Sequence, residues 1–230
     1  MVITKEKTNP NKSARIAGGL YLLLLPLGIL GLIYVPATLI VPGDVATTAS
    51  NIMANESLFR LSIVSALLIQ VVNLFVVLFL YKLLKPVNKN MALLMVIFIL
   101  LGAPIAMLTE VNRAAALLLL NTADLSPALA ALFLDLHEVG IQIASIFWGL
   151  WLFPMGYLVF KSGYIPKMIG VLLIIGCFGY LADSFAFFLF PNFGMTISQF
   201  TFIGELVLPL WLLIKGVNVA QWEKFALQPA

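Results

Sequence analysis

The sequence has few charged residues and almost none of the residue types that build metal and disulfide sites. Only 10% of its 230 residues are charged, whereas an average soluble domain carries about a quarter. The single cysteine, Cys177, excludes an intramolecular disulfide and a cysteine-cluster metal site. The single histidine, His137, excludes a three-histidine zinc centre. A phosphate-binding loop and a dinucleotide fingerprint are also absent from the sequence, so we expect no cofactor.

Long apolar runs dominate the chain instead. Hydrophobic residues make up 62% of it, and the mean hydropathy of +1.09 excludes a disordered chain and a soluble globular domain. A helix needs about 20 apolar residues to cross a bilayer, and the runs are continuous, whereas barrel strands alternate. The sequence therefore predicts an all-α, polytopic bundle of six transmembrane helices. The six stretches are 16–40, 58–81, 91–108, 139–160, 168–190 and 196–214.

The positions of lysine and arginine predict the orientation of the bundle. With a cytoplasmic N-terminus and six crossings, only Arg60 and Arg113 of the 13 basic residues fall outside the cytoplasmic segments. This asymmetry is typical of membrane proteins, and it accounts for the net charge of +3 without a nucleic-acid partner. We expect the cell (cytoplasmic or inner) membrane, with cytoplasmic tails at 1–14 and 219–230 and a transmembrane domain at 15–218.

The third and fourth helices are predicted to extend beyond the membrane. Each carries a short polar belt, at 109–113 and 135–138, and an apolar arm, and the two arms meet at a turn over 121–127. A large apolar surface is unfavourable in water. We expect this hairpin either to pack over the outer mouth of the bundle, against the segment 44–57, or to tilt back into the membrane interface. It could serve as a lid or as a simple structural cap.

Four of the six stretches contain an internal proline. Proline removes a backbone hydrogen bond and kinks a helix, and in a membrane the freed carbonyl needs a neighbouring side chain or water. Kinked helices favour a cavity within the bundle, although ordinary membrane helices also contain proline. The internal prolines include Pro26, Pro104, Pro154 and Pro209.

Ionisable side chains gather in one half of the predicted bundle. At about 1.5 Å per residue, Glu205 lies about 15 Å from the cytoplasmic end, near the midplane, and Asp183 lies about 22 Å from it. The remaining charged groups of the membrane region lie about 28–38 Å from that end. Five carboxylates face two arginines there, an acidic excess of three, although Glu110 and Arg113 are spaced to pair on one helix face. The residues at the outer interface are Arg60, Glu110, Arg113, Asp135, His137 and Glu138.

Polar residues at helical spacing predict which faces point inward. Asp135, Glu138 and Gln142 share one face of the fourth helix, and Gln70 and Asn73 share a face of the second. Because lipid cannot satisfy polar groups, we expect these stripes to meet in an outward-facing acidic pocket. The candidate ligand-binding residues are Glu205, Asp183, Glu138, Asp135, Gln142, Asn73 and Gln70, and the counter-charges are Arg60, Arg113, Glu110 and His137.

The acidic excess leaves three outcomes open: protonated carboxylates, a bound cation or cationic ligand, or a water-filled cavity. The leading hypothesis is a protein that binds, senses or transports a small polar, lipid-derived or cationic ligand. One alternative is an intramembrane hydrolase that uses His137 with a carboxylate, with Ser184 as a candidate nucleophile. Another is a structural or regulatory partner protein without a ligand, in which the polar stripes fix helix packing.

A metal site is not predicted, and the oligomeric state is left open. Asp135 and His137 project from opposite sides of a helix, so the two side chains cannot bind one ion without a backbone irregularity. The partners that we expect are the lipid bilayer and a small-molecule, lipid or cation ligand. A homo-oligomer is compatible with the sequence.

Several short segments give the chain a resemblance to a known family. The chain resembles bacterial six-span membrane proteins that are grouped as domain-of-unknown-function family 4386. The resemblance covers nearly the whole chain and implies a six-helix integral membrane protein, but it implies no activity, substrate or catalytic residues. The segments that carry it are 14–18, 41–44, 56–60, 80–88, 134–137, 156–166, 179–184, 204–205 and 211–218.

Overall fold

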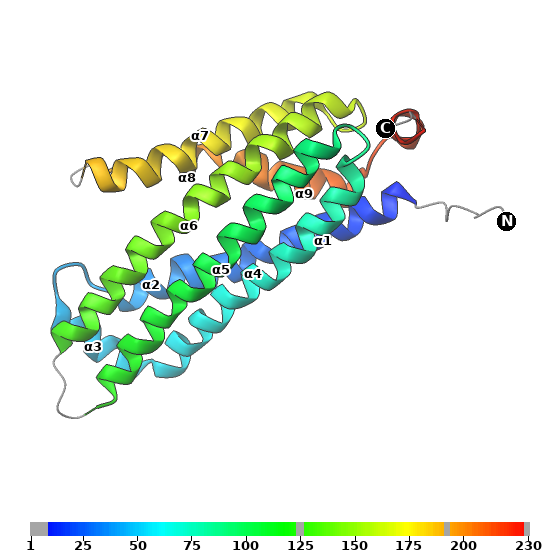
Figure 1. Cartoon of the computed structure of the whole chain (residues 1–230). Coiled ribbons are helices and arrows are strands. Elements are labelled where there is room, and N and C mark those ends of the chain that lie inside the picture. The colour runs from blue at the N-terminus through cyan, green and yellow to red at the C-terminus, as the bar shows by residue number, and fades with distance from the viewer. Residues whose placement is uncertain (1–8, 123–126, 191–193, 228–230) are drawn as a thin grey trace.

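The computed structural model describes residues 9–122, 127–190 and 194–227, and these residues form helices joined by short connections (Figure 1). The prediction of an all-α fold is confirmed. In chain order the elements are α1 (Pro10–Gly28), the π-helix η1 (Ile29–Tyr34), α2 (Val35–Leu39), α3 (Val45–Ala54), α4 (Glu56–Leu84), α5 (Lys89–Leu120), α6 (Pro127–Ser162), α7 (Lys167–Leu189), α8 (Ser198–Thr201), α9 (Ile203–Ile214) and α10 (Val219–Ala226).

Five helical segments among the described residues are long and apolar enough to cross a membrane. They are Pro10–Leu39, which joins α1, η1 and α2, and the helices α4, α5, α6 and α7. A sixth is counted when Ser198–Ile214 is joined to α10 across a bend of 100°. Several apolar helices of this length make the protein a membrane-embedded one. The predicted sixth stretch is therefore present as the short helices α8 and α9, which are separated at Phe202.

The long helices form a closed ring. In sequence around the ring, α1 packs against α4, α4 against α5, α5 against α6, α6 against α7, α7 against α9, and α9 against α1 again. The ring encloses a hydrophobic core that includes Val77, Met95, Leu152 and Leu212. Small residues allow close contact between backbones: a Cβ on Gly156 of α6 would lie 2.6 Å from the carbonyl oxygen of Gly170 on α7.

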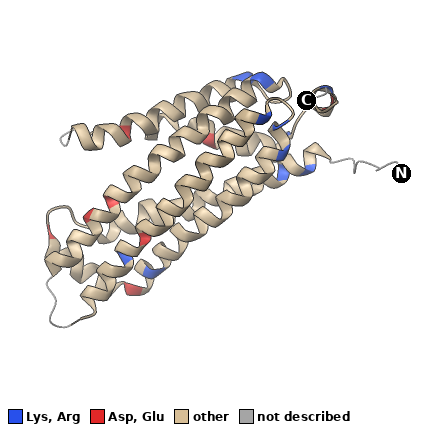
Figure 2. Ribbon diagram, in the orientation of Figure 1, with Lys and Arg blue, Asp and Glu red and all other residues tan. Residues whose placement is uncertain are grey.

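The two ends of the bundle differ in charge (Figure 2). Lysines stand where α4 and α6 end and where α5 and α7 begin, and we call this the basic end. The acidic residues lie mainly towards the opposite end, called the far end below. The charge asymmetry read from the sequence is therefore a spatial separation, while the cytoplasmic location of the basic end stays a prediction. The lysines of the basic end include Lys82, Lys85, Lys89, Lys161, Lys167 and Lys215.

The hairpin of α5 and α6 builds the far end. These helices have 32 and 36 residues and are about 48 and 54 Å long at 1.5 Å per residue, well beyond the roughly 30 Å of bilayer hydrocarbon. Helix α3 packs against α6 and contacts α4 and α5, so the expected contact between the hairpin and the segment 44–57 is confirmed. A second core of Val35, Leu39, Ile52, Phe59 and Leu117 fills this region. Residues 123–126 of the predicted turn lie outside the described residues.

Candidate functional site

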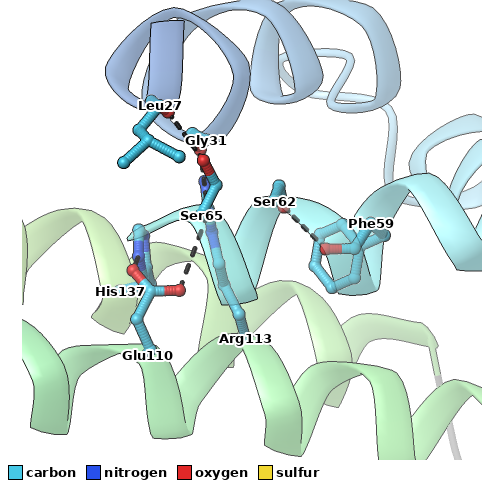
Figure 3. Close-up of polar contacts among 8 residues, drawn as sticks. All are labelled: Leu27, Gly31, Phe59, Ser62, Ser65, Glu110, Arg113 and His137. Atoms are coloured by element: carbon cyan, nitrogen blue, oxygen red, sulfur yellow. Dashed lines mark hydrogen bonds and ion pairs between the residues drawn. The ribbon is translucent and has the colours of Figure 1, made fainter. Parts of the chain in front are cut away.

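Three charged or titratable side chains meet inside the hairpin, and we call them the Arg113 cluster (Figure 3). Glu110 and Arg113 lie on α5 and His137 on α6, and their exposed fractions are only 3%, 2% and 8%. His137 Nε2 lies 2.8 Å from Glu110 Oε1, and Arg113 Nη1 lies 3.6 Å from Glu110 Oε2. The pairing of Glu110 with Arg113, expected from their spacing, is confirmed. The cluster thus joins one carboxylate to one guanidinium and one imidazole.

The Arg113 cluster also holds the irregular part of the first membrane helix. Arg113 Nη1 donates a hydrogen bond of 3.0 Å to the carbonyl oxygen of Gly31, within η1. Ser65 Oγ on α4 donates at 2.9 Å to the carbonyl oxygen of Leu27, which lies one turn before Gly31 in the first helix. Backbone carbonyls near a proline or a π-turn need partners from neighbouring helices in a membrane. Two side chains, Ser65 of α4 and Arg113 of α5, donate to carbonyls of this kind at Leu27 and Gly31 (Figure 3).

Two atoms of the cluster are buried without a hydrogen-bond partner among the described residues. They are Glu110 Oε2, an acceptor, and Arg113 Nε, a donor. Unpaired buried polar atoms cost about 1–3 kcal/mol each. The cluster is therefore polar and desolvated at once, and its compensating contacts are the ion pair, the His137–Glu110 bond and the Arg113–Gly31 bond.

A second polar group, the Glu205 site, lies nearer the basic end. The hydroxyl of Tyr21 on α1 donates to Glu205 Oε2 on α9 at 3.0 Å, and Tyr180 on α7 also interacts with this carboxylate. The ring of Tyr21 contacts Trp151 of α6, with 5.7 Å between the ring centroids. Four helices of the ring therefore contribute to the surroundings of Glu205.

Glu205 differs from Glu110 in having no basic neighbour. Among the described residues, Arg60 pairs with Glu56, and both Arg113 and His137 pair with Glu110. None of these ion pairs involves Glu205. Its second oxygen, Oε1, is buried and has no hydrogen-bond partner. Within the described part of the bundle, Glu205 is thus a carboxylate without a counter-charge.

Asp183, the other acid predicted near the middle of the bundle, has a structural contact. Its Oδ1 accepts from the backbone N–H of Ile197 at 2.6 Å and its Oδ2 from that of Ser198 at 2.8 Å. These bonds satisfy backbone donors that the first turn of α8 leaves free. Asp183 and Glu205 both interact with Tyr180. Asp183 also binds two backbone N–H groups, whereas Glu205 binds a tyrosine hydroxyl.

The remaining charged candidates lie on the surface of the bundle. Asp135 and Glu138 are exposed on α6. Arg60 is exposed as well and pairs with Glu56 one turn away, with 2.6 Å between Arg60 Nη2 and Glu56 Oε1. Gln142 is half-buried. These side chains do not join Glu205, and the acidic excess of the interior is smaller than the sequence count of three.

The uncharged candidates on α4 do point inward. Gln70 and Asn73 are 3% and 7% exposed, and the side-chain oxygen of each is buried without a hydrogen-bond partner among the described residues. Ser184 Oγ on α7 is in the same condition. The interior of the bundle therefore contains three side-chain oxygens, of Gln70, Asn73 and Ser184, that can accept a hydrogen bond and have no partner among the described residues.

Neither of the two most distinct pockets in the described structure contains these residues. One is a depression of about 460 Å³ lined by residues 53–58. The other is a void of about 10 Å³ between α3 and the hairpin, hardly room for one water molecule. Groups of three metal-ligating side chains are absent from the described residues.

Sequence reasoning missed three features of these sites. Tyr21 and Tyr180 lie in apolar runs, and their own hydroxyl groups are the signal that they could bind a carboxylate. The π-helix η1 has no composition signal beyond the glycines near it and the prolines on either side, Pro26 and Pro36. The partner of Arg113, a backbone carbonyl, cannot be read from residue types at all.

Comparison with known proteins identifies the family. A family model described as Domain of unknown function (DUF4386) matches residues 16–216. A protein of Archaeoglobus fulgidus, described as an uncharacterized protein, is 35% identical over 160 residues, which make up 70% of this chain and 86% of the relative. No solved structure matches the chain. Because the family match covers most of the chain, the protein belongs to the DUF4386 family.

Proposed function

We propose that the protein is a membrane module that takes up a proton, the smallest cationic ligand, at Glu205. The observation that carries this proposal is the state of the Glu205 carboxylate. One oxygen accepts from Tyr21 at 3.0 Å, the other is buried without a partner, and no basic side chain of the described residues pairs with it.

The depth of Glu205 makes its charge expensive. Ten residues separate it from Lys215 at the basic end, which corresponds to about 15 Å along a helix. An ionised side chain near the centre of a bilayer costs about 2.5–3.5 kcal/mol on insertion scales. A carboxylate that stays in such a place without a counter-charge favours a bound proton or cation, because either one removes the net charge.

The surrounding groups favour a proton over a metal ion. Ca²⁺ takes 6–8 oxygen ligands, and Mg²⁺ requires six in an octahedron. Around Glu205 the structure provides one carboxylate and two tyrosines, and the described residues contain no cluster of metal-ligating side chains.

Carbodiimide labelling in lipid vesicles tests the proposal. A hydrophobic carbodiimide reacts with protonated carboxyl groups inside a membrane, and mass spectrometry of the digested protein locates the label. We expect labelling of Glu205 near neutral pH, a decrease as the pH rises, and no label at this position in Glu205→Gln. Glu138→Gln is the matched control, because Glu138 is exposed, and it should leave the labelling of Glu205 unchanged.

A flux measurement separates binding from transport. With a pH-sensitive dye inside vesicles and an imposed membrane potential, a transporter acidifies or alkalises the interior and Glu205→Gln loses the signal. A sensor shows the label without the flux. If Glu205 of the wild-type protein takes no label at any pH at which the helices persist, the carboxylate is not protonated and the proposal is wrong.

The hydrolase alternative has less support from the site geometry. His137 does pair with a carboxylate, Glu110, but Ser184 Oγ has no hydrogen-bond partner among the described residues. A serine nucleophile needs a bonded base to activate it. Equal behaviour of Glu205→Gln and the wild-type protein in both assays would favour the remaining alternative, a membrane scaffold without a ligand.

A further inference from the structure

The first membrane helix contacts both polar sites. Tyr21 binds Glu205 through its hydroxyl, and the carbonyl of Gly31 accepts from Arg113. The two positions are ten residues apart, or about 15 Å along a helix. A movement of one part of this segment relative to the other therefore changes the contacts of one site or of both.

The backbone hydrogen bonds between these two contacts are irregular. Pro26 has no N–H to donate, and the N–H of Ile29 is shared between the carbonyl oxygens of Leu25 and Pro26. The π-helix η1 follows directly, and π-turns are rare in helices and common where helices bend. Side chains from outside the segment, Ser65 and Arg113, satisfy two of its carbonyls. The conformation of residues 26–34 thus depends on α4 and α5.

The two parts of the segment also have different neighbours. The α1 part packs against α4 and α9, whereas η1 and α2 pack against α4, and α2 also packs against α3. Gly31 lies close to α4, since a Cβ there would stand 3.0 Å from the carbonyl oxygen of Ser62. Both parts contact α4, and only the α1 part packs against α9. A bend at residues 26–34 can therefore change how α1 packs against α9 without displacing η1 and α2 from α4.

We propose that residues 26–34 form a hinge through which the Arg113 cluster regulates the Glu205 site. The inference rests on the proposed function, since it concerns the same carboxylate. An ionised Glu205 accepts a charge-assisted hydrogen bond from Tyr21, about twice as strong as a neutral one, and this bond holds α1 against α9. Protonation weakens the bond, and α1 moves about the hinge. The Arg113–Gly31 bond sets how far the hinge opens.

Titratable and charged side chains lie next to Glu205 at one end of the proposed hinge mechanism and next to residues 26–34 at the other. Glu205 faces Tyr21 of α1 and Tyr180 of α7, and Tyr180 in turn interacts with Asp183. The hinge faces Arg113, with Glu110 and His137 behind it. Coupling between two sites is reciprocal, so a change at Arg113 alters proton binding at Glu205, and a change at Glu205 alters the hinge.

Hydrogen–deuterium exchange of the full chain in lipid nanodiscs tests this coupling. We expect Glu205→Gln and Tyr21→Phe to change the exchange of amides 29–34 by about fivefold, the effect of one hydrogen bond, although the bond that each removes joins Tyr21 to Glu205 and lies outside this stretch. Arg60→Gln is the matched control, because Arg60 is an exposed arginine that pairs only with Glu56 among the described residues, and it should change nothing. Unchanged exchange at 29–34 in both Glu205→Gln and Tyr21→Phe overturns the hinge proposal, whether or not Glu205 binds a proton.

The reverse direction uses the carbodiimide label as its readout. Arg113→Gln should speed exchange at 29–34 and shift the pH midpoint of Glu205 labelling. Ser65→Ala removes only the bond to Leu27 and serves if Arg113→Gln does not fold. If exchange rises but the labelling midpoint stays at the wild-type value, the Arg113 cluster is purely structural and the coupling is refuted. Absence of any label on wild-type Glu205 instead refutes the proposed function.

Discussion

Replacing Glu110 by glutamine removes the counter-charge of a buried arginine while keeping the size of the side chain. Arg113 is 2% exposed and Glu110 is 3% exposed, so the guanidinium left behind cannot be solvated in place. Removing one partner of a buried pair costs about 3–5 kcal/mol, because an uncompensated charge remains. The amide oxygen of the new glutamine can still accept a hydrogen bond from His137. The change in the free energy of unfolding therefore reports the removed carboxylate charge. We expect Glu110→Gln to lower the free energy of unfolding by roughly this amount.

The pair of Glu56 and Arg60 provides a matched control. Its 2.6 Å separation is shorter than the 3.6 Å of the buried pair, but its side chains are 33% and 59% exposed. Exposed pairs one turn apart contribute only about 0.2–1 kcal/mol. Glu56→Gln should therefore cost much less than Glu110→Gln, even though it breaks the shorter contact. Desolvation, and not distance, decides the difference.

Unfolding in mixed micelles, with sodium dodecyl sulfate as denaturant and circular dichroism as readout, measures both variants. The double variant Glu110→Gln/Arg113→Gln should recover most of the loss, because it removes both charges of the cluster. Equal costs for Glu110→Gln and Glu56→Gln, within about 0.5 kcal/mol, would refute the reasoning. Such a result would show that water reaches Arg113.

Three further substitutions test packing and capping. Gly156→Ala places a Cβ 2.6 Å from the carbonyl oxygen of Gly170, so α6 and α7 must separate, and we expect a loss of about 1–3 kcal/mol in the same micelle assay. Gly28→Ala has no atom within 4 Å of its Cβ and should stabilise by about 0.4–1 kcal/mol; a similar loss in both would contradict the packing argument. Hydrogen bonds from Thr47 lower the pKa of Asp44 below its ordinary 3.8. A lowered pKa means that this cap stabilises α3 above pH 3.8 and is lost as the pH falls through the lowered value. Asp44→Asn keeps a capping side chain, and amide exchange of α3 should lose this pH dependence; the same acid transition in both proteins would exclude Asp44 as its source.

The membrane helices were predictable because their signal is local. The stretch 58–81 corresponds to α4 and 168–190 to α7, within a few residues at each end. The sixth stretch was less exact, since a connection at Phe202 separates α8 from α9. Hydropathy reports the length of an apolar run, but it does not report a break in the backbone hydrogen bonds.

The candidate site was predictable only in part. The spacing of Glu110 and Arg113 predicted their contact, because residues three apart always share a helix face. Asp135 and Glu138 are both exposed, so the polar stripe predicted on this helix does not point into the bundle at these two residues. Periodicity shows which residues lie on one face and leaves open which neighbour that face meets.

What the sequence by itself determined is the class of the molecule: an all-α membrane protein, with the helix lengths and the charge difference between its ends. These properties follow from composition along single helices, where solvation acts residue by residue. Only the tertiary structure decided that Asp183 caps α8, that Arg113 reaches a backbone carbonyl of the first helix, and that Glu205 has two tyrosines and, within the described residues, no basic partner. Contacts between helices depend on how the ring closes, and that closure is set by shape and backbone geometry that no single segment contains.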